Sequence, residues 1–114
     1  MSQILRRDCA ISTTMSVIEG RWKAIIVYEL MMNGKMRFSS LLKLIDGVSP
    51  RMVSKQLKEL EMDGMVVRQV RDTSPVQVEY SLTPKGMSIF PVLNSMLKWG
   101  REHMTCADTD DDEE

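Results

Sequence analysis

One segment of the chain, residues 48–64, combines a helix start with two faces of opposite character. Ser49 followed by Pro50 is typical of a helix start, because the hydroxyl caps free amides and the proline φ suits the first turn. Apolar residues at helical spacing predict a buried face: Val53, Leu57 and Leu60. The same spacing predicts a second face that is basic and lacks acids: Arg51, Ser54, Lys55 and Lys58. Such a helix can lie in a DNA major groove, although a lone basic stripe is more often a solvated face.

Two strand-like runs and a new helix start follow this helix and favour the DNA-binding interpretation. Residues 65–70 are rich in β-branched side chains, 71–75 have turn chemistry, and 76–82 alternate apolar with polar residues. Thr83 and Pro84 then repeat the capping pattern. A helix, a hairpin and another helix in this order predict a winged helix.

The predicted hairpin carries two arginines, Arg68 and Arg71, on or beside its tip. A wing would place them near phosphate or the minor groove, whereas charge that keeps an edge strand from aggregating is the alternative role. The helix upstream favours the wing. The remaining candidates for DNA contact lie at or beside the starts of two helices: Ser49, Met52, Arg37 and Ser39.

The upstream sequence supplies the other helices that this architecture needs. Ser12 or Thr13 is expected to cap a short helix that bears Met15 and Ile18 and ends near Gly20. A longer helix should open at 21–23 and stop at Asn33-Gly34, with a broad apolar surface: Trp22, Ile25, Ile26, Leu30 and Met31. Residues 35–38 should be extended. A helix beginning near Ser39 should then turn inward Leu41, Leu42 and Ile45 and close at Asp46-Gly47, which completes a helix-turn-helix.

The C-terminal helix is predicted from Pro84 to about His103, with Pro91 kinking or splitting it. One apolar row comprises Phe90, Leu93, Leu97 and Met104, and a second comprises Ile89, Val92, Met96 and Trp99. One row suffices for packing on a small domain, so two rows favour a homodimer. The alternative is that both rows pack within the chain against the helix that Trp22 opens.

The length of 114 residues fits a single domain, and the sign of charge is unevenly distributed along it. Six acids lie in 108–114, so residues 1–107 keep 15 basic against ten acidic residues, a net charge of +5. We expect residues 1–107 to form the winged helix-turn-helix domain with its dimerisation helices, and 108–114 to be an acidic disordered tail. No apolar run is long enough to span a membrane and no signal-peptide pattern is present, so a cytoplasmic protein is expected.

The chain resembles the HxlR-type winged-helix transcriptional regulators, which are related in fold to the MarR group. The segments that carry the resemblance are Cys9, Ile18-Glu19-Gly20-Arg21-Trp22-Lys23, Arg37-Phe38-Ser39-Ser40-Leu41, 48–54, 57–64 and 78–86. They cover roughly residues 9 to 100. The family pattern commonly has a proline after the cysteine, where this chain has Ala10, and Gly-Gly before Lys-Trp, where it has Glu19-Gly20-Arg21.

The resemblance implies a mainly α fold with a small β-hairpin wing (α+β) and a homodimer built from the N- and C-terminal helices. It further implies that the helix from Pro50 enters the major groove of a pseudo-palindromic operator in double-stranded DNA, with the hairpin as wing. The expected function is sequence-specific regulation of transcription, with repression as the expected sign. A winged-helix protein-interaction module is the alternative, and a steep loss of affinity with salt would identify the DNA binder.

The two cysteines, Cys9 and Cys106, flank the predicted dimer helices. Some family members sense oxidants or electrophiles through a thiol at the position that Cys9 matches. Basic neighbours at residues 6 and 7 would favour the reactive thiolate, although Asp8 opposes them. Cys106 could then resolve a sulfenic acid as a disulfide. The alternatives are two inert reduced thiols, or an apolar small-molecule effector in a Met-lined pocket between the dimer helices.

Catalysis and metal binding find little support in the sequence. His103 has no nucleophile or acid placed beside it by spacing, and no Gly-rich phosphate loop is present. One histidine and two distant cysteines are too few for a metal site in one chain. The eleven methionines are scattered at helical spacing, as core filler is. We therefore expect no enzyme activity, no metal and no cofactor.

Overall fold

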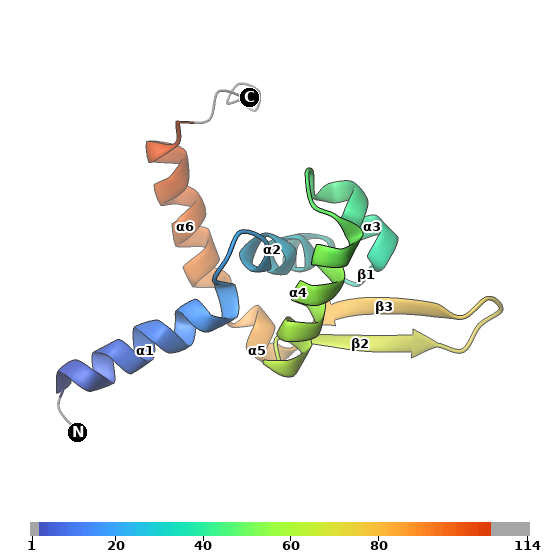
Figure 1. Cartoon of the computed structure of the whole chain (residues 1–114), viewed down its shortest axis with the longest axis horizontal. Helices are drawn as coiled ribbons and strands as arrows, with labels where there is room; N and C mark the ends of the chain where they lie inside the picture. Colours follow the sequence, from blue (N-terminus) through green and yellow to red (C-terminus); the bar gives the residue numbers. More distant parts are fainter. Residues whose placement is uncertain (1–2, 106–114) are drawn as a thin grey trace.

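The computed structural model describes residues 3–105 and confirms the predicted α+β winged-helix architecture. Its elements follow one another as α1 (Gln3–Ile18), α2 (Lys23–Asn33), β1 (Met36–Arg37), α3 (Phe38–Leu44), α4 (Pro50–Met62), β2 (Val66–Arg71), β3 (Gln77–Leu82), α5 (Pro84–Met87) and α6 (Phe90–His103). The strands form one antiparallel sheet in the order β1-β3-β2. Figure 1 shows the β2–β3 hairpin reaching out on one side of the molecule and α1 and α6 on the other, with α2 between.

The helix-turn-helix forms where the sequence predicts it. Gly47 takes a φ of 83°, a left-handed conformation that favours glycine, and ends the turn after α3. Two residues later the Ser49 hydroxyl accepts a hydrogen bond from the Met52 amide at 3.1 Å, so the predicted cap of α4 is confirmed. The predicted core face of α4 is also buried: Val53, Leu57 and Leu60.

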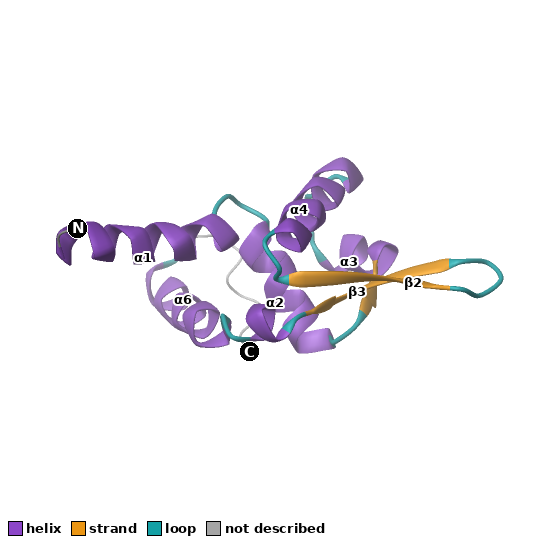
Figure 2. Ribbon diagram, turned by 90° about the horizontal axis from the view of Figure 1, so that it is seen from below, coloured by secondary structure: helices purple, strands orange, loops and turns teal. Residues whose placement is uncertain are grey.

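The wing is held to the end of α4 by hydrogen bonds around Thr83. Its hydroxyl accepts from the Gly86 amide at 3.0 Å, which confirms the predicted cap, and donates to the Gly64 carbonyl at 2.5 Å. The Thr83 amide donates to the Met65 carbonyl at 3.0 Å. Gly86 is buried so close to this carbonyl that an added Cβ would collide with it. These contacts fix where the hairpin leaves the domain, and Figure 2 shows the hairpin nearly edge-on with α4 on one side of it.

The hydrophobic core lies beneath α4 and around α2. The largest fully buried side chains are Ile26, Leu30, Leu41, Leu57, Leu60, Met65, Val27 and Val53. Within the predicted surface of α2, Ile26 and Leu30 are buried, Trp22 and Met31 are half-buried, and Ile25 remains 40% exposed. Trp22 precedes α2 as its cap residue, and its ring lies beside Gly47 of the helix-turn-helix.

Two predicted helix boundaries are wrong. The first helix begins at Gln3 rather than at Ser12 or Thr13, so these two residues lie inside α1. Met15 on this helix is 49% exposed, while Ile18 is buried. The C-terminal helix is split, as the proline predicted, but the break falls at Ser88 and Ile89, and the proline sits in the first turn of α6.

Candidate nucleic-acid interface

The outer face of α4 presents the basic side chains that the sequence predicted. All four predicted members of that face are exposed: Arg51, Ser54, Lys55 and Lys58. Ser49 is also exposed, while Met52 is half-buried and its sulfur accepts a hydrogen bond from Gln56 Nε2 at 3.2 Å. The structure therefore brings five of the six candidates from this segment together on solvent-facing surface, with Met52 at its border.

An acidic residue, Glu59, borders this basic face, and its charge is engaged by a lysine from another helix. Glu59 Oε1 lies 3.0 Å from Lys23 Nζ at the start of α2. The hydrogen bond and positive charge of Lys23 hold the pKa of Glu59 below its ordinary value. The sequence analysis missed this pair, because Lys23 and Glu59 are far apart in the chain and no local pattern links them.

The two wing arginines lie on opposite faces of the hairpin. Arg68 pairs with Tyr80 in the sheet register, while Gln69 pairs with Glu79. Because successive side chains of a strand point to opposite faces, Arg68 shares a face with Tyr80, which packs on the core. Arg71 lies on the other face, where its Nη1 is 3.1 Å from Glu79 Oε1. Both arginines were expected on or beside the hairpin tip. Arg71 ends β2 beside the tip as expected, whereas Arg68 is the third residue of the strand and lies away from it.

The face that carries Arg71 continues into a second basic region at the start of α3. Arg37 is opposite Glu79 in the register of β1 and β3, so it shares this face, and Ser39 follows in α3; both are exposed. A shallow hollow of about 370 Å³ is lined by Lys35, Gln69, Val70 and Arg71. Lys35 was not predicted from the sequence, since it is remote in the chain from the other residues that line this hollow.

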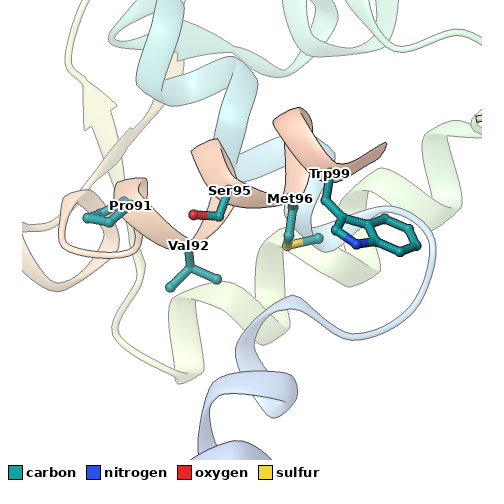
Figure 3. Close-up of a pocket in the computed structure, with 5 residues that line it drawn as sticks. All are labelled: Pro91, Val92, Ser95, Met96 and Trp99. Carbon is teal, nitrogen blue, oxygen red and sulfur yellow. The ribbon is translucent and has the colours of Figure 1, made fainter. Parts of the chain in front are cut away.

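Apolar side chains gather on one side of α6 and where it adjoins α1. Figure 3 shows Val92, Met96 and Trp99 along one side of α6, where they line an open hollow of about 720 Å³ together with Pro91 and Ser95. A second hollow of about 390 Å³ lies between the helices and is lined by Ala10, Ile11, Thr14, Met15 and Ile18 of α1 with Val92 and Met96 of α6. Trp99 is 64% exposed and stacks on His103 at a ring separation of 4.1 Å.

The alternative, in which both apolar rows of α6 pack within the chain, is wrong. Leu93 is buried and Ile89 and Leu97 are half-buried, but the remaining members are exposed: Phe90, Val92, Met96, Trp99 and Met104. Met104 also lies beyond the end of the helix. The chain on its own therefore leaves an apolar face of α6 uncovered.

Cys9 is an exposed free thiol on α1. A helix turns by about 100° per residue, which places Cys9 about half a turn away from the row of α1 residues that lines the groove with α6. Cys9 thus faces away from the groove. Cys106 lies outside the described residues. Within the described part of the chain, no group of three or more His, Cys, Asp or Glu side chains could hold a metal ion.

A helix-turn-helix with an exposed basic second helix and a two-stranded wing defines the winged-helix class of DNA-binding proteins. The family model described as HxlR-like helix-turn-helix matches residues 17–108, and the chain belongs to that family. It is accordingly a helix-turn-helix transcriptional regulator. No helix of the described residues is long and apolar enough to cross a membrane.

Relatives and solved structures agree with this assignment. The chain is 42% identical over 95 residues to the HTH-type transcriptional regulator YdeP of Bacillus subtilis, covering 83% of this chain and 73% of the relative. It superposes on the redox regulator HypR in its oxidised form with a TM-score of 0.79 and 39% identity, covering 86% of this chain and 100% of HypR. For diamide-treated YodB from Bacillus subtilis the TM-score is 0.67 and the identity 31%, covering 90% and 94% of the two chains. Regulators of the MarR family share the fold as well.

Proposed function

We propose that this regulator binds specific DNA sequences with α4 in the major groove. The observation that carries the proposal is the two-sided helix: one face is anchored in the core, and the other exposes the basic side chains of Arg51, Lys55 and Lys58. The residues assigned to base and phosphate contact are Ser49, Arg51, Met52, Ser54, Lys55 and Lys58. Arginine can pair with guanine in the groove, whereas lysines and the capping serine suit phosphate or base edges.

The sheet and α3 extend this contact surface to either side of the groove. Arg37 and Ser39 are assigned to phosphate contact at the start of α3, and Arg68 and Arg71 to the wing. Lys35 adds a further positive charge beside Arg71. Such contacts position a protein on the duplex and add affinity that depends on salt.

Fluorescence anisotropy tests the assignment, with the duplex most enriched when the wild-type protein selects from a random pool. We expect Arg51→Ala and Lys55→Ala each to weaken binding by about tenfold, since each removes a direct contact. Lys98→Ala, an exposed lysine of α6, is the matched control and should bind normally. Affinity should also fall steeply as salt rises. Failure to enrich any duplex, together with weak salt dependence, would favour the protein-interaction module instead.

We further propose that the protein binds as a homodimer through α1 and α6, on a pseudo-palindromic operator. The uncovered apolar face of α6 supports this, since a monomer gains nothing from exposing Val92, Met96 and Trp99 to water. A two-fold dimer presents two α4 helices to two half-sites. Occupying a promoter in this way would block transcription, so we propose repression; transcription in vitro with and without the protein tests the sign.

We propose that oxidation or electrophile modification of Cys9 controls DNA binding. HypR and YodB, solved in oxidised and diamide-treated forms, support the proposal, as does the exposure of Cys9. Cys106 is assigned as the resolving thiol. Diamide should abolish tight binding to the selected duplex by the wild type and leave Cys9→Ser unaffected. Unchanged binding after diamide would favour the alternative, an apolar effector in the hollows lined by Met96.

A further inference from the structure

Lys23 is the single charged side chain that is buried among those the structure describes, with only 5% of the residue exposed. It is the first residue of α2, the helix that Figure 1 shows between α1 and α4. No role in DNA contact can be assigned to it, because it does not reach the surface. A buried ammonium must nevertheless be paired, since removing it from water without partners is strongly unfavourable.

The two partners of Lys23 come from two different helices. Its Nζ donates to the backbone carbonyl of Ser16 at 3.3 Å and lies 3.0 Å from Glu59 Oε1. Ser16 is in the last turn of α1, where carbonyls lack partners within the helix and a positive charge is favourable. Glu59 lies in α4, next to Lys58 on the flank of the basic face. One ammonium thus joins the end of α1 to the side of the recognition helix.

We propose that Lys23 is a positioning residue that sets the angle of α4 relative to α1, and through it the half-site spacing that the protein accepts. The inference rests on the proposed homodimer, in which α1 belongs to the dimer interface. If α1 is fixed by the partner and α4 is fixed to α1, the two recognition helices keep one separation. The same contact holds the pKa of Glu59 below its ordinary value, which favours the ionised carboxylate that pairs with the lysine.

Affinity should depend strongly on the spacing between the two half-sites, because DNA is helical. One inserted base pair moves one half-site by about 3.4 Å along the axis and rotates it by about 35°. A rigid pair of recognition helices cannot follow both changes. A pair whose α4 helices have lost their tie to α1 can adjust, and it should discriminate less between spacings.

The experiment compares three duplexes: the selected duplex and its versions with one base pair inserted or removed at the centre of symmetry. We expect the wild type to bind the altered duplexes at least about twentyfold more weakly than the selected duplex. Lys23→Met should bind them less than about fivefold more weakly. Lys23→Arg should restore discrimination, because a guanidinium can also bridge a carbonyl and a carboxylate. Lys98→Met, the same substitution at an exposed position of α6, is the matched control.

The slope of affinity against salt should stay the same in Lys23→Met, since Lys23 contacts no phosphate. Circular dichroism at the temperature of the titration checks that each variant is folded. If Lys23→Met does not fold, Glu59→Gln tests the same tie from the side of α4 and should relax spacing in the same direction.

Three results would overturn the inference, and they differ from one another. A folded variant that discriminates spacings like the wild type shows that Lys23 does not position α4. If Lys23→Met binds all three duplexes more weakly than the wild type by the same factor, Lys23 only stabilises the fold. A wild-type protein that ignores spacing contradicts the proposed dimeric recognition itself, before any variant is examined.

Discussion

The α4 and α6 helices have nearly the same length and similar sequence patterns, yet they end in opposite environments. Each carries a proline in its first turn and apolar residues at helical spacing. In α4 the predicted apolar face is fully buried, with Leu57 only 1% exposed. In α6 only Leu93 is buried, and Trp99 is 64% exposed. Apolar spacing therefore predicts that a face will avoid water, but it does not say which surface covers that face.

The difference follows from what lies beneath each helix. The α4 helix rests on α2 and β2, and the hydrogen bonds at Thr83 tie its end to the wing. The α6 helix contacts α2 but extends beyond it. The side of α6 that carries Val92 and Met96 borders the hollow that it forms with α1. The helix-turn-helix half is complete within one chain, whereas the half formed by α1 and α6 is the surface we propose for the second copy.

The largest expected loss of stability comes from a substitution in the core beneath α4. Leu57→Ala should lower the free energy of unfolding by about 2–5 kcal/mol, because it leaves a cavity in a closely packed core. Urea unfolding followed by circular dichroism measures this loss. Met62→Ala on the same helix, where the side chain is 80% exposed, should change stability by less than about 0.5 kcal/mol. Similar losses at both positions would contradict the described core.

A change on the exposed apolar face of α6 should weaken the proposed dimer. Met96→Glu should weaken dimerisation by at least about a hundredfold, about 2.8 kcal/mol, because a carboxylate would be buried in an apolar interface. Sedimentation velocity over a range of protein concentrations measures the change. Met62→Glu introduces the same charge on α4 and should leave the dimer intact. A Met96→Glu protein that still sediments as a dimer would place the interface elsewhere.

Two glycines, one tightly enclosed and one in open space, test the difference in packing between the two regions. Gly86→Ala should destabilise the protein by about 1–3 kcal/mol, because its Cβ would collide with the Met65 carbonyl that Thr83 already holds. Gly100→Ala in α6 meets no atom within 4 Å and should stabilise it by about 0.5–1 kcal/mol. Thermal unfolding of the two variants tests both signs. Equal effects would show that the packing around Gly86 is looser than described.

The smallest effect concerns Glu59 and depends on pH. Because Lys23 lowers the pKa of folded Glu59, ionised Glu59 stabilises the protein above its unfolded pKa, and this contribution is lost as pH falls from about 4.5 through the lower folded value. Glu59→Gln should therefore flatten the fall in stability over that range. Since the Glu59 side chain is 40% exposed, solvent screening keeps the effect modest. Glu61→Gln, at an exposed position of the same helix, is the control and should retain the slope of the wild type.

Short sequence patterns predicted the helix starts and the buried face of α4. The caps at Ser49 and Thr83 and the buried face of α4 required only neighbours in the chain. The start of α1 was missed because hydroxyl residues that usually cap a helix lie inside it. Ser12 and Thr13, the predicted caps, lie in the middle of α1. The hydroxyls of their neighbours bond backward along the helix, where Thr14 Oγ1 donates to the Ala10 carbonyl at 3.0 Å and Ser16 Oγ to the Thr13 carbonyl at 2.7 Å.

Other features of the site depend on contacts that are remote in the chain. The ion pair of buried Lys23 with half-exposed Glu59 forms only once α2 and α4 pack together. The spacing of three residues in one strand puts Arg68 and Arg71 on opposite faces, but which of them shares the face that packs on the core depends on the register of the hairpin. The sequence could place these residues near the site, but it could not orient them.

We propose that two copies of the chain, joined through α1 and α6, each place one α4 helix on the operator. Sedimentation equilibrium of the wild-type protein with the labelled selected duplex tests this most directly. We expect two chains on each duplex at saturation. A saturated complex with one chain on each duplex would contradict it.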